Sequence, residues 1–251
     1  MKFSIIASGS KGNATIVRYN NTNILIDMGI SLTRLNAGLS NFGLNVKDID
    51  AALFTHEHND HISGVKFISP KIQYSLSGTL GSSLSNVVEI FEPFVIGDFT
   101  VTAFPTSHDA TNPCGFVLEA GNEKLTYVTD TGVLPDISKS IAHNPDYLII
   151  ESNHDIKMLL KTNRTFELKT RIMSDYGHLC NEDSAITAIE LIGPKTKQIF
   201  LAHLSEEANT PEMALSAYQK IFRHFHINID NYEIRCANQW VPTLGGNLDE
   251  N

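Results

Sequence analysis

The stretch THEHNDH, residues 55–61, places three histidines and an aspartate within six consecutive positions: His56, His58, Asp60 and His61. It continues the apolar run DAALFT (residues 50–55), which is typical of a short buried strand. A strand that leads into a short loop can hold side chains at fixed positions. Because neutral imidazole and carboxylate are zinc ligands, the stretch predicts a metal site rather than the alternative, an exposed polar turn.

Length and composition are those of a globular chain with a large core. The chain has 251 residues, 42% of them hydrophobic, and we expect one domain over residues 1–251. The apolar N-terminal stretch is shorter than that of a signal peptide, and no run of about 20 apolar residues follows it. The three cysteines lack C-x-x-C spacing, which is typical of reduced thiols. We therefore expect a cytoplasmic protein with no membrane partner.

Strand-like and helix-like patterns occur in the same order in both halves of the chain. The first half has expected strands at 3–8, 14–19, 23–28 and 50–55 and an expected helix at 31–43. The second half has expected strands at 99–108, 115–120, 124–132, 146–152 and 198–205, and expected helices at 136–144, 182–193 and 210–226. Two such halves predict two sheets packed face to face with helices outside, a four-layer αββα sandwich of the α/β class.

Three further candidate ligands follow apolar strands of the second half. His108, Asp130 and His203 each lie at the end of an expected strand. Strand ends on one edge of a sheet converge, so we expect these side chains to join the four of residues 55–61. The seven candidates suffice for two metal ions that share a carboxylate: His56, His58, Asp60, His61, His108, Asp130 and His203. Each alone could be an ordinary polar strand end, but their repetition argues for a site.

The motifs THEHNDH, TDTG (129–132) and AHLS (202–205), with His108 between the first two, resemble the metallo-β-lactamase superfamily over nearly the whole chain. NILIDMG, with Asp27, is similar to that superfamily's first motif, whose aspartate supports the metal loop. The resemblance implies the metallo-β-lactamase fold and assigns the ligands: His56, His58 and His108 on one ion, Asp60, His61 and His203 on the other, and Asp130 bridging. Zinc suits this donor set best, with manganese or iron as alternatives.

Within the superfamily, the chain resembles RNase Z-like phosphodiesterases and matches the YycJ/WalJ group most closely. IIESNHD (149–155) and GHLCNEDSA (177–185) are similar to the loops that protonate the leaving oxygen in such enzymes. By this likeness the catalytic residues are Asp60, Glu151 and His178, and the last two form the proton-handling pair. The alternatives are a strand-end carboxylate and a surface histidine. Cys180 stands where a serine is expected in this group.

The resemblance implies a phosphodiesterase or nuclease that uses hydroxide activated by two divalent metal ions. Likeness to the YycJ/WalJ group favours DNA over RNA and an exonuclease acting 5′ to 3′. Hydrolysis of a small ester or thioester, as in glyoxalase II or lactonases, is the alternative. A regulatory protein with a structural metal site is less favoured, because no ligand is missing from the set.

A net charge of −9 argues against general affinity for polyanions. Local charge differs, because basic residues between positions 157 and 171 outnumber the single acidic residue, Glu167. We expect this run to contact the nucleic-acid backbone, and its members are Lys157, Lys161, Arg164, Lys169 and Arg171. An ordinary solvated face is the alternative. The glycine-rich SGSKGNAT (8–15) also resembles the YycJ/WalJ group, and its amides could meet an anion or form a plain hairpin turn.

Overall fold

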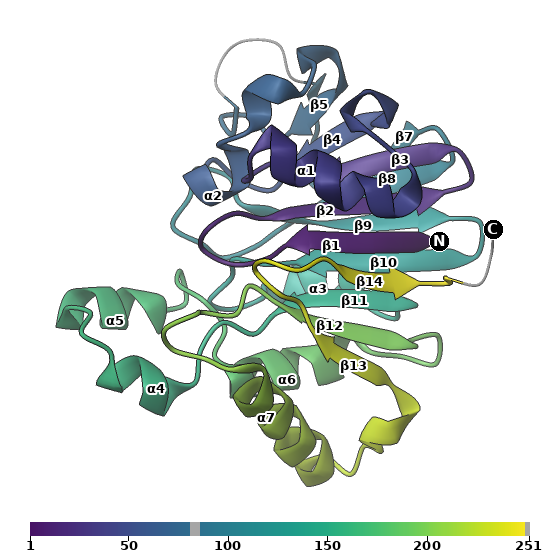
Figure 1. Cartoon of the computed structure of the whole chain (residues 1–251). Helices are drawn as coiled ribbons and strands as arrows, with labels where there is room; N and C mark the ends of the chain where they lie inside the picture. Colours follow the sequence, from purple (N-terminus) through teal and green to yellow (C-terminus); the bar gives the residue numbers. More distant parts are fainter. Residues whose placement is uncertain (81–85, 249–251) are drawn as a thin grey trace.

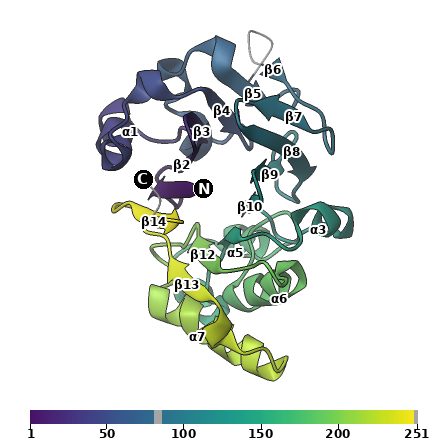
Figure 2. The same ribbon diagram turned by 90° about the vertical axis from the view of Figure 1, so that its right-hand side faces the viewer.

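The computed structural model describes residues 1–80 and 86–248, whose strands form two mixed sheets packed face to face (Figures 1 and 2). The first sheet, in the order β14-β1-β2-β3-β4-β5-β6, consists of β1 (Lys2–Ala7), β2 (Ala14–Tyr19), β3 (Thr22–Ile26), β4 (Ala51–Phe54), β5 (Gln73–Ser75), β6 (Asn86–Val87) and β14 (Thr243–Gly246). The second, in the order β13-β12-β11-β10-β9-β8-β7, consists of β7 (Phe94–Ile96), β8 (Phe99–Pro105), β9 (Cys114–Ala120), β10 (Glu123–Val128), β11 (Tyr147–Glu151), β12 (Gln198–Ala202) and β13 (Glu233–Cys236).

The described helices lie outside the two sheets, and not all of them pack on a sheet. They are α1 (Leu32–Leu39), α2 (Asn59–Ile62), α3 (Asp136–Ala142), α4 (Ile156–Lys161), α5 (Phe166–Ile172), α6 (Asn181–Leu191) and α7 (Pro211–His224). Leu35 and Leu39 of α1 pack on the first sheet, whereas buried residues of α3, α6 and α7 pack on the second. Figure 2 shows α1 and α7 at opposite ends of the view with the strands between them. The predicted αββα sandwich is confirmed.

The central core lies between the two sheets. The Phe3 ring of β1 meets the Phe200 ring of β12 edge to face, with centroids 5.0 Å apart. In β3, Ile24 and Ile26 face this core while Leu25 faces the α1 side, because side chains alternate along a strand. Both faces of β3 are therefore buried, which accounts for its unbroken apolar run.

Caps and turns fall where the sequence predicts them. Ser31 Oγ accepts a hydrogen bond from Arg34 N at the start of α1, and Thr210 Oγ1 caps α7. The helix expected at 31–43 ends at Leu39 and continues as a short 3₁₀ helix, η1 (Ser40–Phe42), up to Gly43, whose φ is 67°. The expected strands β1, β2 and β3 pair as an antiparallel meander.

The prediction that each half of the chain forms one of the two sheets is wrong for one strand. β14, near the C-terminal end, pairs with β1 and completes the first sheet. The sequence patterns also do not predict the short strands β5, β6, β7 and β13, the helices α2, α4 and α5, and the 3₁₀ helices η2 (Val46–Asp48), η3 (Val65–Phe67), η4 (Pro70–Ile72) and η5 (Ile229–Asn231). None of the described helices is long and apolar enough to cross a membrane.

Candidate metal centre

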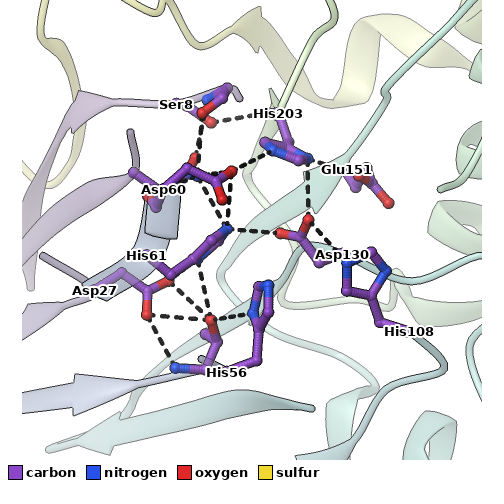
Figure 3. A network of polar contacts seen from close by, with 12 residues as sticks. Ser8, Asp27, His56, Asp60, His61, His108, Asp130, Glu151 and His203 are labelled. Carbon is purple, nitrogen blue, oxygen red and sulfur yellow. Dashed lines mark hydrogen bonds and ion pairs between the residues drawn. The ribbon is translucent and has the colours of Figure 1, made fainter. Parts of the chain in front are cut away.

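The candidate ligands gather where strands of both sheets end, as Figure 3 shows. Asp27 follows β3, His56 follows β4, Asp130 follows β10, Glu151 is the last residue of β11 and His203 follows β12. Because β3 and β4 are parallel, as are β10, β11 and β12, the carboxyl ends within each group lie at the same edge of their sheet. Packing of the two sheets brings these edges together.

All seven predicted ligands lie in one cluster. Three sets offer ligand atoms within 4.8 Å of one another: His56, His58 and His108; Asp60, His61 and His203; and His56, His61 and Asp130. Asp130 lies between the first two sets, with Oδ2 3.2 Å from His61 Nε2 and Oδ1 3.8 Å from His108 Nε2. This arrangement has the geometry expected of two neighbouring sites with a shared carboxylate.

Four imidazoles of the cluster are held through their Nδ1 atoms. The contacts are His61 Nδ1 to Asp27 Oδ2 (2.7 Å), His56 Nδ1 to Thr55 Oγ1 (3.0 Å), His108 Nδ1 to Gly177 O (3.0 Å) and His203 Nδ1 to Glu151 Oε1 (2.8 Å). Histidines that bind metals are usually anchored in this way through the second ring nitrogen. The anchors leave Nε2 of each ring available to the centre.

Unsatisfied buried atoms show that the cluster fits metal ions. The buried side-chain atoms without a hydrogen-bond partner include His56 Nε2, His203 Nε2 and Asp130 Oδ2, of which the last lies 3.2 Å from His61 Nε2 as an ion-pair contact. Buried polar atoms without partners are uncommon, because each costs about 1–3 kcal/mol. Coordination of a divalent ion would satisfy these atoms, and a set of imidazoles and carboxylates suits such ions.

When metal is absent, protons on the imidazoles compensate the negative charge of the carboxylates in the cluster. Burial lowers the pKa of His61, but the carboxylates of Asp27 and Asp130 outweigh this effect and raise the pKa to about 10. Burial raises the pKa of Asp130, but neighbouring imidazoles, His203 first, hold it well below its ordinary value. The metal-free cluster therefore pairs charged carboxylates with imidazolium groups, and metal ions would displace those protons.

Glu151 anchors His178 as well as His203. Its carboxylate is fully buried, and Oε1 lies 2.7 Å from His178 Nδ1 and 2.8 Å from His203 Nδ1. Oε2 accepts hydrogen bonds from Thr131 N at 3.1 Å and Leu179 N at 3.2 Å. Burial raises the pKa of Glu151, but the imidazoles, His178 first, lower it to about 2. Glu151 lies close enough to Asp130, His178 and His203 to share a metal ion with them. However, the four hydrogen-bond donors already use the acceptor capacity of its carboxylate.

The backbone is strained at three of these strand ends. Asp27, Asp130 and His203 have φ values of 59°, 55° and 54°, in the left-handed region that residues other than glycine seldom adopt. Such conformations persist only where surrounding contacts impose them, and they concentrate at functional sites. Here they turn the chain sharply after β3, β10 and β12.

Comparison with known proteins identifies the family of the chain. The model described as the beta-lactamase superfamily domain matches residues 22–203. The chain belongs to the metallo-β-lactamase superfamily. It is 32% identical to "Exodeoxyribonuclease YycJ" of Bacillus anthracis, with 97% of each chain covered. It is 36% identical to "Exodeoxyribonuclease WalJ" of Streptococcus pneumoniae strain D39, with 85% of each covered. The resemblance to the YycJ/WalJ group is thus confirmed, and the chain is a hydrolase of this superfamily.

Solved structures agree on the fold. The metallo-β-lactamase fold protein YhfI of Bacillus subtilis superposes with a TM-score of 0.73 at 17% identity, covering 97% of this chain and 99% of that one. The short form of human tRNase Z gives a TM-score of 0.63 at 17% identity, covering 97% and 98%. The metallo-β-lactamase fold implies divalent metal ions at the cluster.

Two residues of the glycine-rich segment also support the cluster. Ser8 Oγ accepts a hydrogen bond from His203 N at 2.8 Å, and Asn13 Nδ2 lies 3.0 Å from His61 Nε2. Asn13 N donates to Asp60 O at 2.7 Å. The glycines mark this segment in the sequence, but no sequence pattern assigns Ser8 or Asn13 to the metal centre.

The suggestion that amides of this segment meet an anion is not supported. Gly9 N donates to Asn13 Oδ1 at 2.9 Å, Lys11 N to Gln239 Oε1 at 3.0 Å and Gly12 N to Gly9 O at 3.0 Å. These amides are used inside the protein. The segment is a structural turn that positions Asn13 beside Asp60.

The predicted basic run forms the helices α4 and α5, which project from the body of the molecule (Figure 1). Lys169 Nζ donates to Leu160 O at 2.8 Å and Thr162 O at 2.7 Å, so this cation caps the end of α4. Lys157 and Lys161 are exposed on α4.

The two arginines of the run form ion pairs. Arg164 Nε lies 3.0 Å from Glu207 Oε2, and Arg171 pairs with Asp109, next to the candidate ligand His108. These pairs and the Lys169 cap reduce the charge that α4 and α5 offer to a partner. Lys157 and Lys161 therefore become the principal candidates for a phosphate contact.

The unexpected cysteine at position 180 takes over the capping role of a serine. Cys180 Sγ accepts a hydrogen bond from Asp183 N at 3.4 Å at the start of α6 and lies 3.1 Å from Asp183 Oδ2. Burial raises the pKa of the thiol to about 12. The residue therefore remains a thiol that stabilises the helix following His178.

Proposed function

We propose that the protein is a metal-dependent nuclease that degrades DNA as an exonuclease from the 5′ end. The observation that carries this proposal is His178, an imidazole outside the seven-residue ligand cluster that is oriented by a fully buried carboxylate. A phosphodiester alkoxide is a poor leaving group and benefits from such an acid, whereas a thioester releases a stable thiolate. The names of the YycJ and WalJ relatives support DNA as the substrate.

The seven clustered residues would hold two divalent ions, with Asp130 between them: His56, His58, Asp60, His61, His108, Asp130 and His203. When bound, the ions would lower the pKa of a water molecule and stabilise negative charge on the phosphoryl oxygens. Asp27 and Thr55 keep the rings of His61 and His56 in position through their Nδ1 atoms. Asp60, whose side chain is 23% exposed, lies at the open side of the cluster and orients the attacking group.

His178 would deliver the proton to the departing oxygen. Its Nδ1 atom donates to Glu151, so Nε2 is the nitrogen left for the substrate, and it would deliver its proton when the ring carries hydrogens on both nitrogens. The side chain keeps 19% of its surface exposed, which allows contact with a substrate. Glu151 stays ionised at neutral pH because the imidazoles lower its pKa to about 2, and its carboxylate holds the His178 ring through Nδ1. Glu151 thus acts through His178.

A panel of labelled substrates tests the proposal. The metal-loaded protein is incubated with single-stranded and duplex DNA and RNA, labelled at the 5′ or the 3′ end, and with a small thioester. We expect early release of short labelled products from 5′-labelled single-stranded DNA and progressive shortening of the 3′-labelled strand. Rapid thioester hydrolysis without cleavage of any oligonucleotide would support the glyoxalase II-like alternative and contradict the proposal.

A further inference from the structure

An exposed tryptophan with two cations at its ring lies in a segment that hydrogen bonds link to the candidate metal centre. Trp240 is the only tryptophan of the chain, and it keeps 56% of its surface exposed. Lys11 Nζ lies 5.5 Å from the centroid of its ring, and the guanidinium carbon of Arg34 lies 4.8 Å from it. Both distances are within the range of a cation–π interaction. The two cations lie over the indole ring, and more than half of the side chain's surface remains open to solvent.

Hydrogen bonds hold the indole in this exposed position. Trp240 Nε1 donates to Glu206 Oε1 at 2.7 Å, and Trp240 N donates to Asn238 Oδ1 at 2.7 Å. Glu206 Oε2 also pairs with Lys11 Nζ at 2.8 Å, so the ring and the lysine share one anchor. A large aromatic ring that is fixed but not packed into the core is suited to stacking against a ligand.

The segment that carries Trp240 is connected to the metal centre through the glycine-rich turn. Gln239 is buried, and its side chain accepts from Lys11 N and donates to Gly12 O at 2.9 Å. The next residue of the turn, Asn13, contacts Asp60 and His61. Two successive sets of hydrogen bonds therefore join the tryptophan segment to the candidate ligands and fix its position relative to the candidate metal centre.

We propose that Trp240 is a stacking platform for a nucleobase of the single-stranded DNA that enters the site, with Lys11 and Arg34 close to the adjacent phosphates. This inference rests on the proposed nuclease function. Every base has a π-face, so stacking holds a strand without selecting its sequence, as an exonuclease that degrades any strand requires. Loss of one stacked base weakens binding by roughly tenfold or more, and the two cations add a salt-dependent contribution.

The single tryptophan allows stacking to be measured directly. Fluorescence of the metal-loaded protein is followed during titration with a phosphorothioate oligothymidylate, which resists cleavage, and with an abasic oligonucleotide of the same length. We expect the oligothymidylate to quench the emission and the abasic strand, which has the phosphates but no bases, to leave it nearly unchanged. Equal quenching by both strands, or quenching by neither although the oligothymidylate binds, would overturn the platform.

The kinetics of Trp240 variants test whether the platform contributes to DNA cleavage. Trp240→Ala should raise the KM for a single-stranded oligonucleotide roughly tenfold with little change in kcat. Trp240→Phe should restore most of the affinity, and bis(p-nitrophenyl) phosphate should be cleaved at the same rate by all forms. Val95→Ala, which removes an exposed apolar side chain on β7, is the matched control. Unchanged DNA kinetics in Trp240→Ala would overturn the platform and leave the nuclease function intact, whereas absence of DNA binding and cleavage in the unmodified protein would overturn both.

Discussion

Asp27 positions two candidate ligands without belonging to the ligand set. Its Oδ2 atom accepts a hydrogen bond from His61 Nδ1, and its Oδ1 atom accepts one from Thr55 N at 2.9 Å. Thr55 Oγ1 in turn contacts His56 Nδ1. One buried carboxylate thus fixes the ring orientation of a histidine from each of the two proposed metal positions.

Asp27→Asn should weaken metal binding about 10- to 100-fold, because the amide cannot hold the His61 ring as the carboxylate does. Competition with a fluorescent chelator measures the affinity. Asp50→Asn is the control, since Asp50 accepts a hydrogen bond from Asn23 N at the opposite end of β4. Equal metal affinity in the Asp27 variant and the unmodified protein would show that this carboxylate has no supporting role.

His178→Ala should keep the full metal content and slow cleavage of DNA by about a hundredfold or more, the usual size of a general-acid contribution. The same variant should lose far less rate on bis(p-nitrophenyl) phosphate, whose leaving group needs little protonation. Measuring both substrates with one preparation cancels errors in concentration and metal loading. A similar loss on both, or loss of a metal ion, would reassign His178 to binding or coordination.

Residue spacing predicts the candidate ligands but not their supports. Apolar runs that end in His or Asp identify His108, Asp130 and His203, because parallel strands bring their ends to one edge. The groups that anchor these ligands follow no such pattern. The partner of His108 is the carbonyl of Gly177, 69 positions away, and any residue could provide that carbonyl. No side-chain pattern in the sequence signals such a contact.

At the level of elements, the sequence predicts long helices with a clear apolar stripe more readily than short ones, although α3, with seven residues, is predicted too. Helix α7 has 14 residues and a clear apolar stripe, whereas α4 and α5 have six and seven. Their caps, Asp155 and Thr165, are ordinary capping residues, but the helices are too short to show a period. β14 reads TLGG, a sequence with low strand propensity that is held by pairing with β1.

The cations of α4 and α5 should have two different roles: Lys157 and Lys161 should contribute to DNA binding, and Lys169 should contribute to the stability of the fold. Replacing Lys157 and Lys161 by Ala should weaken DNA binding and flatten its salt dependence, because fewer counterions are released. Lys169→Ala should instead lower stability by about 1 kcal/mol, because two carbonyls at the end of α4 lose their donor. Salt titration of DNA binding and thermal unfolding separate these effects. A salt slope unchanged in the Lys157/Lys161 variant would favour the alternative, a solvated face.

At the scale of the whole molecule, metal binding, protonation and stability are linked. The folded pKa of His61, about 10 without metal, lies above the ordinary value of about 6.5. Its stabilising contribution is therefore complete below about pH 6.5 and is lost as the pH rises towards about 10. A metal ion must displace this proton, so metal affinity should rise over the same interval.

Thermal unfolding between pH 6.5 and 9.5 measures this linkage, within the interval set by the ordinary pKa of about 6.5 and the folded value of about 10. With chelator present the Tm should fall as the pH rises, while the increase in Tm caused by added metal should grow. A metal-induced increase in Tm that shrinks as the pH rises would contradict the exchange of protons for metal at His61.

Catalysis should require two metal ions held by one cluster of side chains. Zinc or manganese is titrated into the metal-free protein, and cleavage of a DNA strand is measured after each addition. We expect little activity up to one equivalent per chain and a plateau at two, with no such rise in Asp130→Ala, which lacks the shared carboxylate. Full activity at one equivalent, or cleavage that persists without metal, would contradict the account.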